Sequence, residues 1–224
     1  RAGHEVDLYE ASDRLGGRMA SRAKGDHLID LGFHVLHTAY PALHRWVDVE
    51  ALDAKPMDAC TMTIHPGTGR QRVLGDALNA PQYLLPTLNS VGIIDGLRFL
   101  RWRLSTSGKD LERSMDRPSP TIADGLRARR FTSSTRDVLK PLFAGITLDP
   151  SLSERMAFAD FAWGAMAHGE MIVPSGGIAA VPQQLADRLS TTQVHLSTAV
   201  SSVSATSVVV DEVERTSDRS VLVM

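Results

Sequence analysis

The sequence of 224 residues predicts an α/β fold: an incomplete Rossmann-like domain with a helical and mixed insertion. Three observations predict it. The short segment Glu5–Tyr9 alternates apolar and polar residues, as a strand with two different faces does. From residue 81 to about 168, apolar residues recur at spacings of three and four, which indicates helices. Beyond Gln193 the β pattern returns, for example at 208–210.

The first predicted strand ends at an acid, Glu10. One carboxylate in this position can accept hydrogen bonds from both hydroxyls of an adenosine ribose. We therefore expect Glu10 to bind a ribose.

A turn rich in glycine and arginine follows Glu10 within eight residues. Gly16 and Gly17 allow positive φ and let backbone N–H groups approach a phosphate without a Cβ in the way. Arg14 and Arg18 add guanidinium donors that suit phosphate oxygens. An acid, two glycines and two arginines in this order predict a site for a nucleotide that carries a diphosphate.

The Gly-x-Gly-x-x-Gly turn that normally accompanies such an acid is expected about 20 residues upstream of it. The sequence starts at Arg1, so that turn has no place in it. Residues 1–4 resemble the end of a helix, with Gly3 just beyond its last turn. We expect the chain to be a fragment that begins inside a βαβ unit.

The remaining elements follow in order. A helix is predicted over 40–49, and a hairpin over 61–74 around a Pro-Gly-Thr-Gly turn. Ser119 and Ser153 are predicted to cap two of the helices in the middle region. The predicted domains are 1–60 (partial nucleotide-binding domain), 61–185 (mainly helical insertion with the hairpin) and 186–224 (β-rich return to the first domain).

Three blocks resemble flavin-dependent amine oxidases, phytoene desaturases and protoporphyrinogen oxidases. These families share a Glu-x-x-x-Arg-x-Gly-Gly-Arg-x-x-Ser segment after the second Rossmann strand. The blocks occur in family order and are residues 10–21 with 29–34, residues 142–150 with 173–185, and residues 194–203.

The resemblance implies an FAD-dependent oxidoreductase whose insertion is the substrate domain. Glu10 would bind the adenosine ribose, and Arg14, Gly16, Gly17 and Arg18 the diphosphate. The flavin-proximal residues would be Leu31, Gly32, Phe33 and His34, and Val200 would contact the adenine through its backbone. The family's C-terminal flavin segment is missing, and no side chain is assigned a catalytic role.

Two alternatives stay open. A nicotinamide-dependent dehydrogenase also ends its second strand at an acid, but that function does not explain the Arg-Leu-Gly-Gly-Arg turn. A non-catalytic fragment of a flavin family is the second alternative. For the turn at 174–177, a tight interdomain turn is favoured over an anion site at a helix N-terminus.

The composition of the chain argues against several kinds of partner and ligand. The net charge of −2 gives no electrostatic argument for nucleic-acid binding, and no apolar window is long enough to span a membrane. The single cysteine, Cys60, excludes an intrachain disulfide and fits a reducing, cytoplasmic location. His34, His37 and His44 have no acidic or cysteine partner at metal spacing, so no metal is expected.

The segment 97–104 carries three arginines beside Phe99 and Trp102. The pattern favours an ordinary amphipathic helix of the insertion. The alternative is a helix that lies on a membrane surface and admits a lipophilic substrate. In either case the predicted partner is a small-molecule substrate, and the oligomeric state is not indicated.

Overall fold

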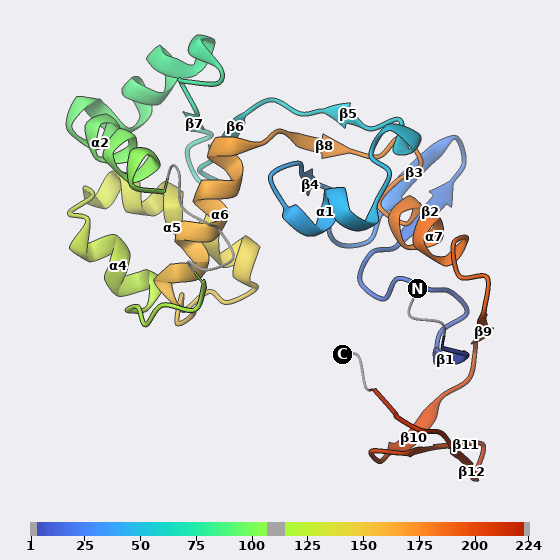
Figure 1. Cartoon of the computed structure of the whole chain (residues 1–224). Coiled ribbons are helices and arrows are strands. Elements are labelled where there is room, and N and C mark those ends of the chain that lie inside the picture. Colours follow the sequence, from blue (N-terminus) through green and yellow to red (C-terminus); the bar gives the residue numbers. More distant parts are fainter. Residues whose placement is uncertain (1–3, 107–114, 222–224) are drawn as a thin grey trace. The chain divides into compact units, whose positions relative to one another are not determined.

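The computed structural model describes residues 4–106 and 115–221. Of the helix end predicted at residues 1–4, all but His4 lies outside this part of the chain. Contacts between Cα atoms divide the chain into two compact units (Figure 1). Unit 1 comprises 1–35, 42–55 and 173–224, and unit 2 comprises 36–41 and 56–172. Along the sequence, unit 2 therefore lies between parts of unit 1.

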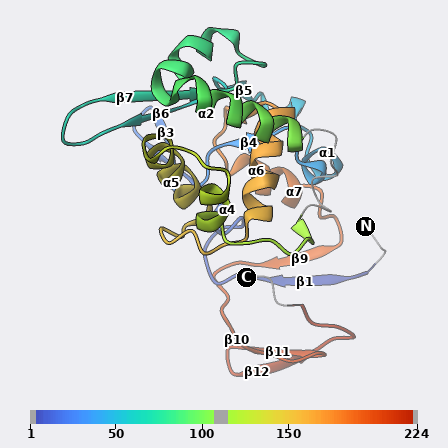
Figure 2. The ribbon, with the colours of Figure 1, turned by 90° about the vertical axis from the view of Figure 1, so that its left-hand side faces the viewer.

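The strands of unit 1 form small sheets. β1 (Val6–Tyr9) runs parallel to β9 (Thr192–His195), which confirms the first predicted strand (Figure 2). β2 (Ser21–Lys24) and β3 (His27–Asp30) form an antiparallel hairpin. The C-terminal part folds into an antiparallel meander of β10 (Val200–Val203), β11 (Ser207–Val210) and β12 (Val213–Thr216).

Two helices of unit 1 support each other near their ends. These are α1 (Pro41–Trp46), shorter than the predicted 40–49, and α7 (Ala180–Ala186); the short 3₁₀ helix Glu50–Leu52 follows α1. The side chain of Gln184 both donates to Asp48 O and accepts from Asp48 N, at 2.9 and 2.8 Å. Arg188 donates to Trp46 O at 2.8 Å, which satisfies a carbonyl at the end of α1.

Unit 2 contains the predicted hairpin, now observed as β6 (Cys60–Ile64) and β7 (Gln71–Gly75). Its helices are the 3₁₀ helix Pro81–Tyr83, α2 (Leu84–Thr106), α4 (Ile122–Ala128), α5 (Ser133–Thr147) and α6 (Met156–His168). A small sheet has the order β4 (Leu36–His37), β8 (Met171–Val173), β5 (Lys55–Pro56). None of the helices in the described residues is long and apolar enough to cross a bilayer.

Aromatic side chains make up much of the core of unit 2. Trp102 of α2 stacks on Trp163 of α6 with ring centroids 4.6 Å apart, and it also contacts Phe131 and Phe143. Phe131 and Phe143 are almost fully buried. Large rings that interlock in this way bury much apolar surface per residue, so they hold α2, α5 and α6 together.

The helix starts differ from the predicted caps. Thr121 caps α4 by accepting from Asp124 N at 3.1 Å, so the predicted cap at Ser119 is wrong by two residues. Ser153 does not cap α6, because its hydroxyl donates to Asp149 Oδ2 at 2.7 Å. The first turn of α6 instead uses Ser119, which accepts from Ala157 N at 3.0 Å.

The boundaries of the compact units also differ from the predicted domains. Residues 173–185, expected in the insertion, belong with unit 1. The reason is local hydrogen bonding: Ser175 N donates to Leu52 O, and Ser175 Oγ donates to Asp53 O, both in unit 1. In the other direction, residues 36–41 belong with unit 2, where β4 pairs with β8.

Candidate nucleotide-binding site

The acid Glu10 lies directly after β1, as predicted, and its carboxylate is held in place by Ser12. The backbone N–H and the hydroxyl of Ser12 lie 2.7 and 2.8 Å from Oε1 of Glu10. The Ser12 N–H holds the pKa of the Glu10 carboxyl below its ordinary value, and the Ser12 hydroxyl and the charge of Arg14 act in the same direction. Among the described residues, these hydrogen bonds use Oε1 only. Oε2 can therefore accept from a ligand.

The backbone around Glu10 is tied to the segment that leads into β10. Glu10 N donates to His195 O, Thr198 N donates to Glu10 O, and Ser197 N donates to Ser12 O. Val200 follows this segment as the first residue of β10, where it pairs with Val210. The structure thus brings together the two regions that the sequence assigns to the adenosine end of a ligand, although they are far apart in the chain.

The double-glycine segment forms a tight turn in which Met19 N donates to Gly16 O at 2.9 Å. Gly16 has φ +103° and Gly17 has φ +52°, both in the region that favours glycine. No heavy atom lies within 4 Å of the position that a Cβ on Gly17 would occupy. The backbone at Gly17 is therefore open to a ligand, and Arg14 braces it by donating to Gly17 O at 3.0 Å.

The predicted flavin-proximal segment passes beside this turn. Leu31 N donates to Ala20 O at 2.8 Å, and a Cβ added to Gly32 would lie 3.0 Å from Arg18 O. Leu31 and Phe33 are 57% and 60% exposed, although both are large and apolar. His34 is exposed as well. In unit 1, the apolar side chains of Leu31 and Phe33 are therefore exposed next to the double-glycine turn.

The sequence analysis did not predict the residues that pack against the double-glycine turn or hold the helix that does so. A methyl group on Gly16 would lie 2.6 Å from Cγ of Pro182, so helix α7 packs directly against the turn. Asp30 and Ser21 accept hydrogen bonds from the backbone N–H groups of Ile178 and Ala179, just before α7. Asp30 and Ser21 lie within the blocks that carry the resemblance, but the sequence did not show that they act on α7.

These contacts also favour a structural role for residues 174–177. The backbone N–H groups of Ile178 and Ala179, which follow this turn, already have protein acceptors in Asp30 and Ser21. Gly177 has φ +73°, and a Cβ there would lie 2.4 Å from Ser21 Oγ. A carboxylate of the chain thus occupies the position that an external anion would need, in agreement with the favoured interpretation.

The three histidines considered for a metal do not form one cluster. His37 lies in β4 of unit 2 with its ring against Tyr40, and burial lowers its pKa. His34 is exposed in unit 1, and His44 lies in α1. Over residues 4–106 and 115–221, no three His, Cys, Asp or Glu side chains are grouped so that they could hold a metal ion.

Unit 2 contains a cavity of about 990 Å³. Its walls come from the hairpin β6–β7, the loop 76–80, helix α2 and the end of α6. Most lining side chains are apolar, and they include Leu74, Leu88, Leu97, Leu142 and Trp163. A cavity of this size and lining can hold an organic molecule with a large apolar surface.

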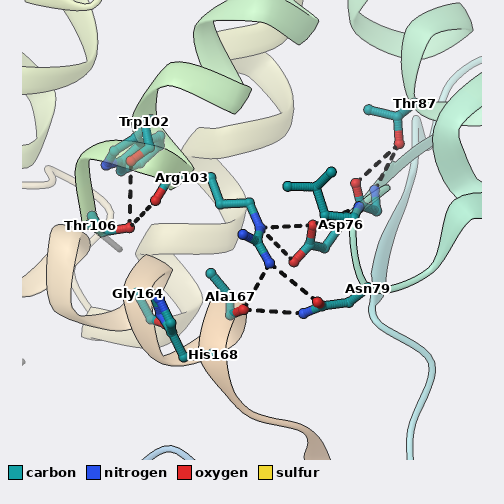
Figure 3. Close-up of polar contacts among 11 residues, drawn as sticks. Asp76, Asn79, Thr87, Trp102, Arg103, Thr106, Gly164, Ala167 and His168 are labelled. Atoms are coloured by element: carbon teal, nitrogen blue, oxygen red, sulfur yellow. Dashed lines mark hydrogen bonds and ion pairs between the residues drawn. The ribbon is translucent and has the colours of Figure 1, made fainter. Parts of the chain in front are cut away.

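A polar cluster at the cavity joins three elements (Figure 3). Nε of Arg103 donates to both carboxylate oxygens of Asp76 at 3.0 Å. Its Nη2 donates to Asn79 Oδ1 at 3.2 Å and to Ala167 O at 2.9 Å. The guanidinium charge is thereby balanced by Asp76, and the paired groups fix the loop 76–79 between α2 and α6.

Helix α2 combines a buried and an exposed apolar face. Phe99 and Trp102 are buried, whereas Leu97 and Leu104 are about 60% exposed, at 62% and 59%. Gly92, with φ +80°, interrupts the helix. The buried face is what an ordinary amphipathic helix requires. Contact of the exposed face with a membrane stays a prediction.

The close approach of Gly16 to Pro182 leads to a stability prediction. We expect Gly16→Ala to lower the free energy of unfolding by about 2–4 kcal/mol, because an added Cβ meets both a positive φ and the Pro182 ring. The matched control is Gly25→Ala: Gly25 has φ +60°, but nothing lies within 4 Å of the added Cβ. It should cost only about 1–2 kcal/mol. Urea unfolding of the two full-length variants measures the difference, and equal losses would show that Pro182 is not a steric limit.

An acid after a strand, a braced double-glycine turn and a parallel strand pair in one unit are typical of α/β proteins that bind dinucleotides. The family model described as flavin containing amine oxidoreductase matches residues 1–222. The chain therefore belongs to the family of flavin containing amine oxidoreductases, as the resemblance predicted.

Solved structures agree on the fold at low sequence identity. An oxidoreductase from Methanosarcina mazei is 16% identical with a TM-score of 0.64, covering 97% of this chain and 52% of its own. A triple mutant of putrescine oxidase, redesigned in cofactor binding, is 16% identical with a TM-score of 0.61. The match covers 94% of this chain and 50% of the putrescine oxidase chain. The chain thus spans about half the length of these structures and shares a mixed α/β fold with them. No match was found among curated proteins.

Proposed function

We propose that the protein is an FAD-dependent oxidoreductase of the amine oxidase/phytoene desaturase type, which oxidises or desaturates an organic substrate by hydride transfer to the flavin. One observation carries the proposal. In a chain of the flavin containing family, Glu10, the open turn at Gly17 and the exposed segment 31–34 occur together in unit 1. This order along one surface suits a ribose, a diphosphate and a planar ring system in turn.

The residues of unit 1 fit the parts of FAD. Oε2 of Glu10 would accept from the adenosine ribose, and the backbone of Val200 would contact the adenine. The diphosphate would lie at Gly16 and Gly17, with guanidinium donors from Arg14 and Arg18. The exposed segment of Leu31, Gly32, Phe33 and His34 would lie near the isoalloxazine ring. When bound, the flavin supplies the redox chemistry, and the protein orients the reactants and excludes water.

The cavity of unit 2 is the proposed place for the substrate. Its lining is mainly apolar, which favours a substrate with a large apolar surface. The guanidinium of Arg103 is already paired with Asp76, so it would act as a fixed hydrogen-bonding wall and not as a free cation. A neighbouring structure is named putrescine oxidase, and amine oxidation is accordingly one of the proposed reactions.

The test is the colour and cofactor content of the purified full-length protein. We expect a yellow protein with flavin absorbance bands that releases FAD on denaturation. Apoprotein should bind FMN about 100-fold more weakly than FAD, because FMN lacks the adenylate part that Glu10 and Val200 would hold.

Each other outcome has a definite meaning. A colourless protein that stays colourless with added FAD contradicts the proposal, and binding of a nicotinamide dinucleotide instead would point to a dehydrogenase. A protein that binds FAD but consumes no oxygen, and transfers no electrons to a dye acceptor, with amines or polyenes as substrates would be a non-catalytic member of the family.

A further inference from the structure

The carboxylate of Asp30 connects the hairpin β2–β3 to the start of helix α7. Oδ1 of Asp30 accepts from the hydroxyl of Ser21 at 2.5 Å and from the backbone N–H of Ile178 at 3.0 Å. Oγ of Ser21 in turn accepts from Ala179 N at 3.1 Å. Two side chains of the hairpin thus hold two successive backbone N–H groups that no residue within the helix can satisfy.

The junction is closely packed and leaves little freedom for α7 to shift. A Cβ on Gly177 would lie 2.4 Å from Ser21 Oγ and 2.9 Å from Asp30 Oδ1. Ile178 is fully buried. The position of α7 along its axis is therefore set by hydrogen bonds at its start and by packing beside them.

The same helix carries the residue that abuts the double-glycine turn. Pro182 is the third residue of α7, in its first turn, and its Cγ would be 2.6 Å from a methyl group on Gly16. A displacement of α7 would either open a gap behind Gly16 or push the turn outward. Over the described residues, Asp30 forms no hydrogen bond with the turn 16–19 itself. It reaches the turn through its two partners, which are Ile178 at the start of α7 and Ser21, two residues after Met19.

We propose that Asp30 is a positioning residue for the dinucleotide: its carboxylate holds α7, and α7 through Pro182 holds the double-glycine turn in the shape that accepts the diphosphate. The functional part of this inference rests on the proposed function. The mechanical part concerns only the chain and can be tested without flavin.

The first measurement is amide hydrogen exchange of the full-length apoprotein. The reporter is Met19 N–H, which is bonded to Gly16 O, and the reference is Glu10 N–H, bonded to His195 O. We expect Asp30→Ala to speed exchange at Met19 about tenfold and to leave Glu10 within about twofold. Asp30→Asn keeps an oxygen acceptor for Ile178 N–H and should stay close to wild type.

The second measurement is the dissociation constant for FAD. Asp30→Ala should weaken binding about tenfold, and Asp30→Asn should restore most of it. The matched control is Asp187→Ala, which removes a carboxylate at the other end of α7 that accepts from Gln183 Nε2 at 2.7 Å. That variant should leave both the affinity and the exchange at Met19 unchanged.

A double-mutant cycle tests the route. If the effect passes through α7, Asp30→Ala and Pro182→Ala should weaken FAD binding less than the product of their separate effects. Equal acceleration at Met19 and Glu10 in Asp30→Ala would overturn the proposal, because it would indicate a general loss of stability. If wild type binds no FAD, the proposed function fails, and the exchange result still decides whether Asp30 holds the turn.

Discussion

Replacing Glu10 with alanine is expected to weaken FAD binding by about 100-fold. The carboxylate would accept from the ribose hydroxyls, and hydrogen bonds to a charged group contribute about 1.5–3 kcal/mol each. Glu10→Gln can still accept from Ser12 but has only one acceptor oxygen left, so about tenfold weaker binding is expected. Titration of the full-length apoprotein with FAD, followed by flavin fluorescence, measures both effects.

The control for Glu10 is Glu5→Gln, an exposed acid at the start of the same segment, which should change the affinity by less than about twofold. The pH dependence provides a second check. Because Ser12 lowers the pKa of Glu10 in the folded protein, the carboxylate stays charged at and above its ordinary pKa. Its contribution should be constant from about pH 5 to 8 and be lost only as the pH falls through the lowered pKa. A decline between pH 5 and 8 would assign the effect to another group.

Replacing Trp102 with alanine is expected to lower the free energy of unfolding by about 3–5 kcal/mol. The indole is 2% exposed, stacks on Trp163, and donates from Nε1 to Asp160 Oδ1 at 2.7 Å. Truncation removes the stacked ring and also the partner on which the Arg129 guanidinium lies, 4.7 Å from the ring centroid. Trp102→Phe keeps an aromatic ring but loses the N–H donor, so an intermediate loss of about 1–3 kcal/mol is expected.

The matched control for Trp102 is Trp46→Ala, because Trp46 in α1 is 51% exposed. It should cost less than about 1 kcal/mol. Urea unfolding of the full-length variants, with near-ultraviolet circular dichroism as the signal for tertiary packing, compares the midpoints. If Trp102→Ala shifts the midpoint no more than Trp46→Ala does, the aromatic cluster is not the main support of unit 2.

The sequence correctly predicted those secondary-structure elements that are defined by a pattern of only a few neighbouring residues. The strand before Glu10 and the hairpin β6–β7 follow from alternation and from turn residues, and both are observed. The caps at Ser119 and Ser153 were wrong because several serines and threonines compete in each stretch. The choice between them depends on partners that the chain brings in from elsewhere, such as Asp149 for Ser153.

The sequence alone predicted the acid, the double glycine and the arginines as a site, and it predicted the family. It could do so because the residues assigned to the ribose and the diphosphate lie close together in the chain. Only the tertiary structure decided that Ser12 holds Glu10, that residues 195–198 lie against it, and that α7 and Asp30 support Gly16. It also decided where the cavity lies. Apart from the contact between Ser12 and Glu10, these contacts join residues more than 100 positions apart, and their geometry depends on packing and not on local propensity.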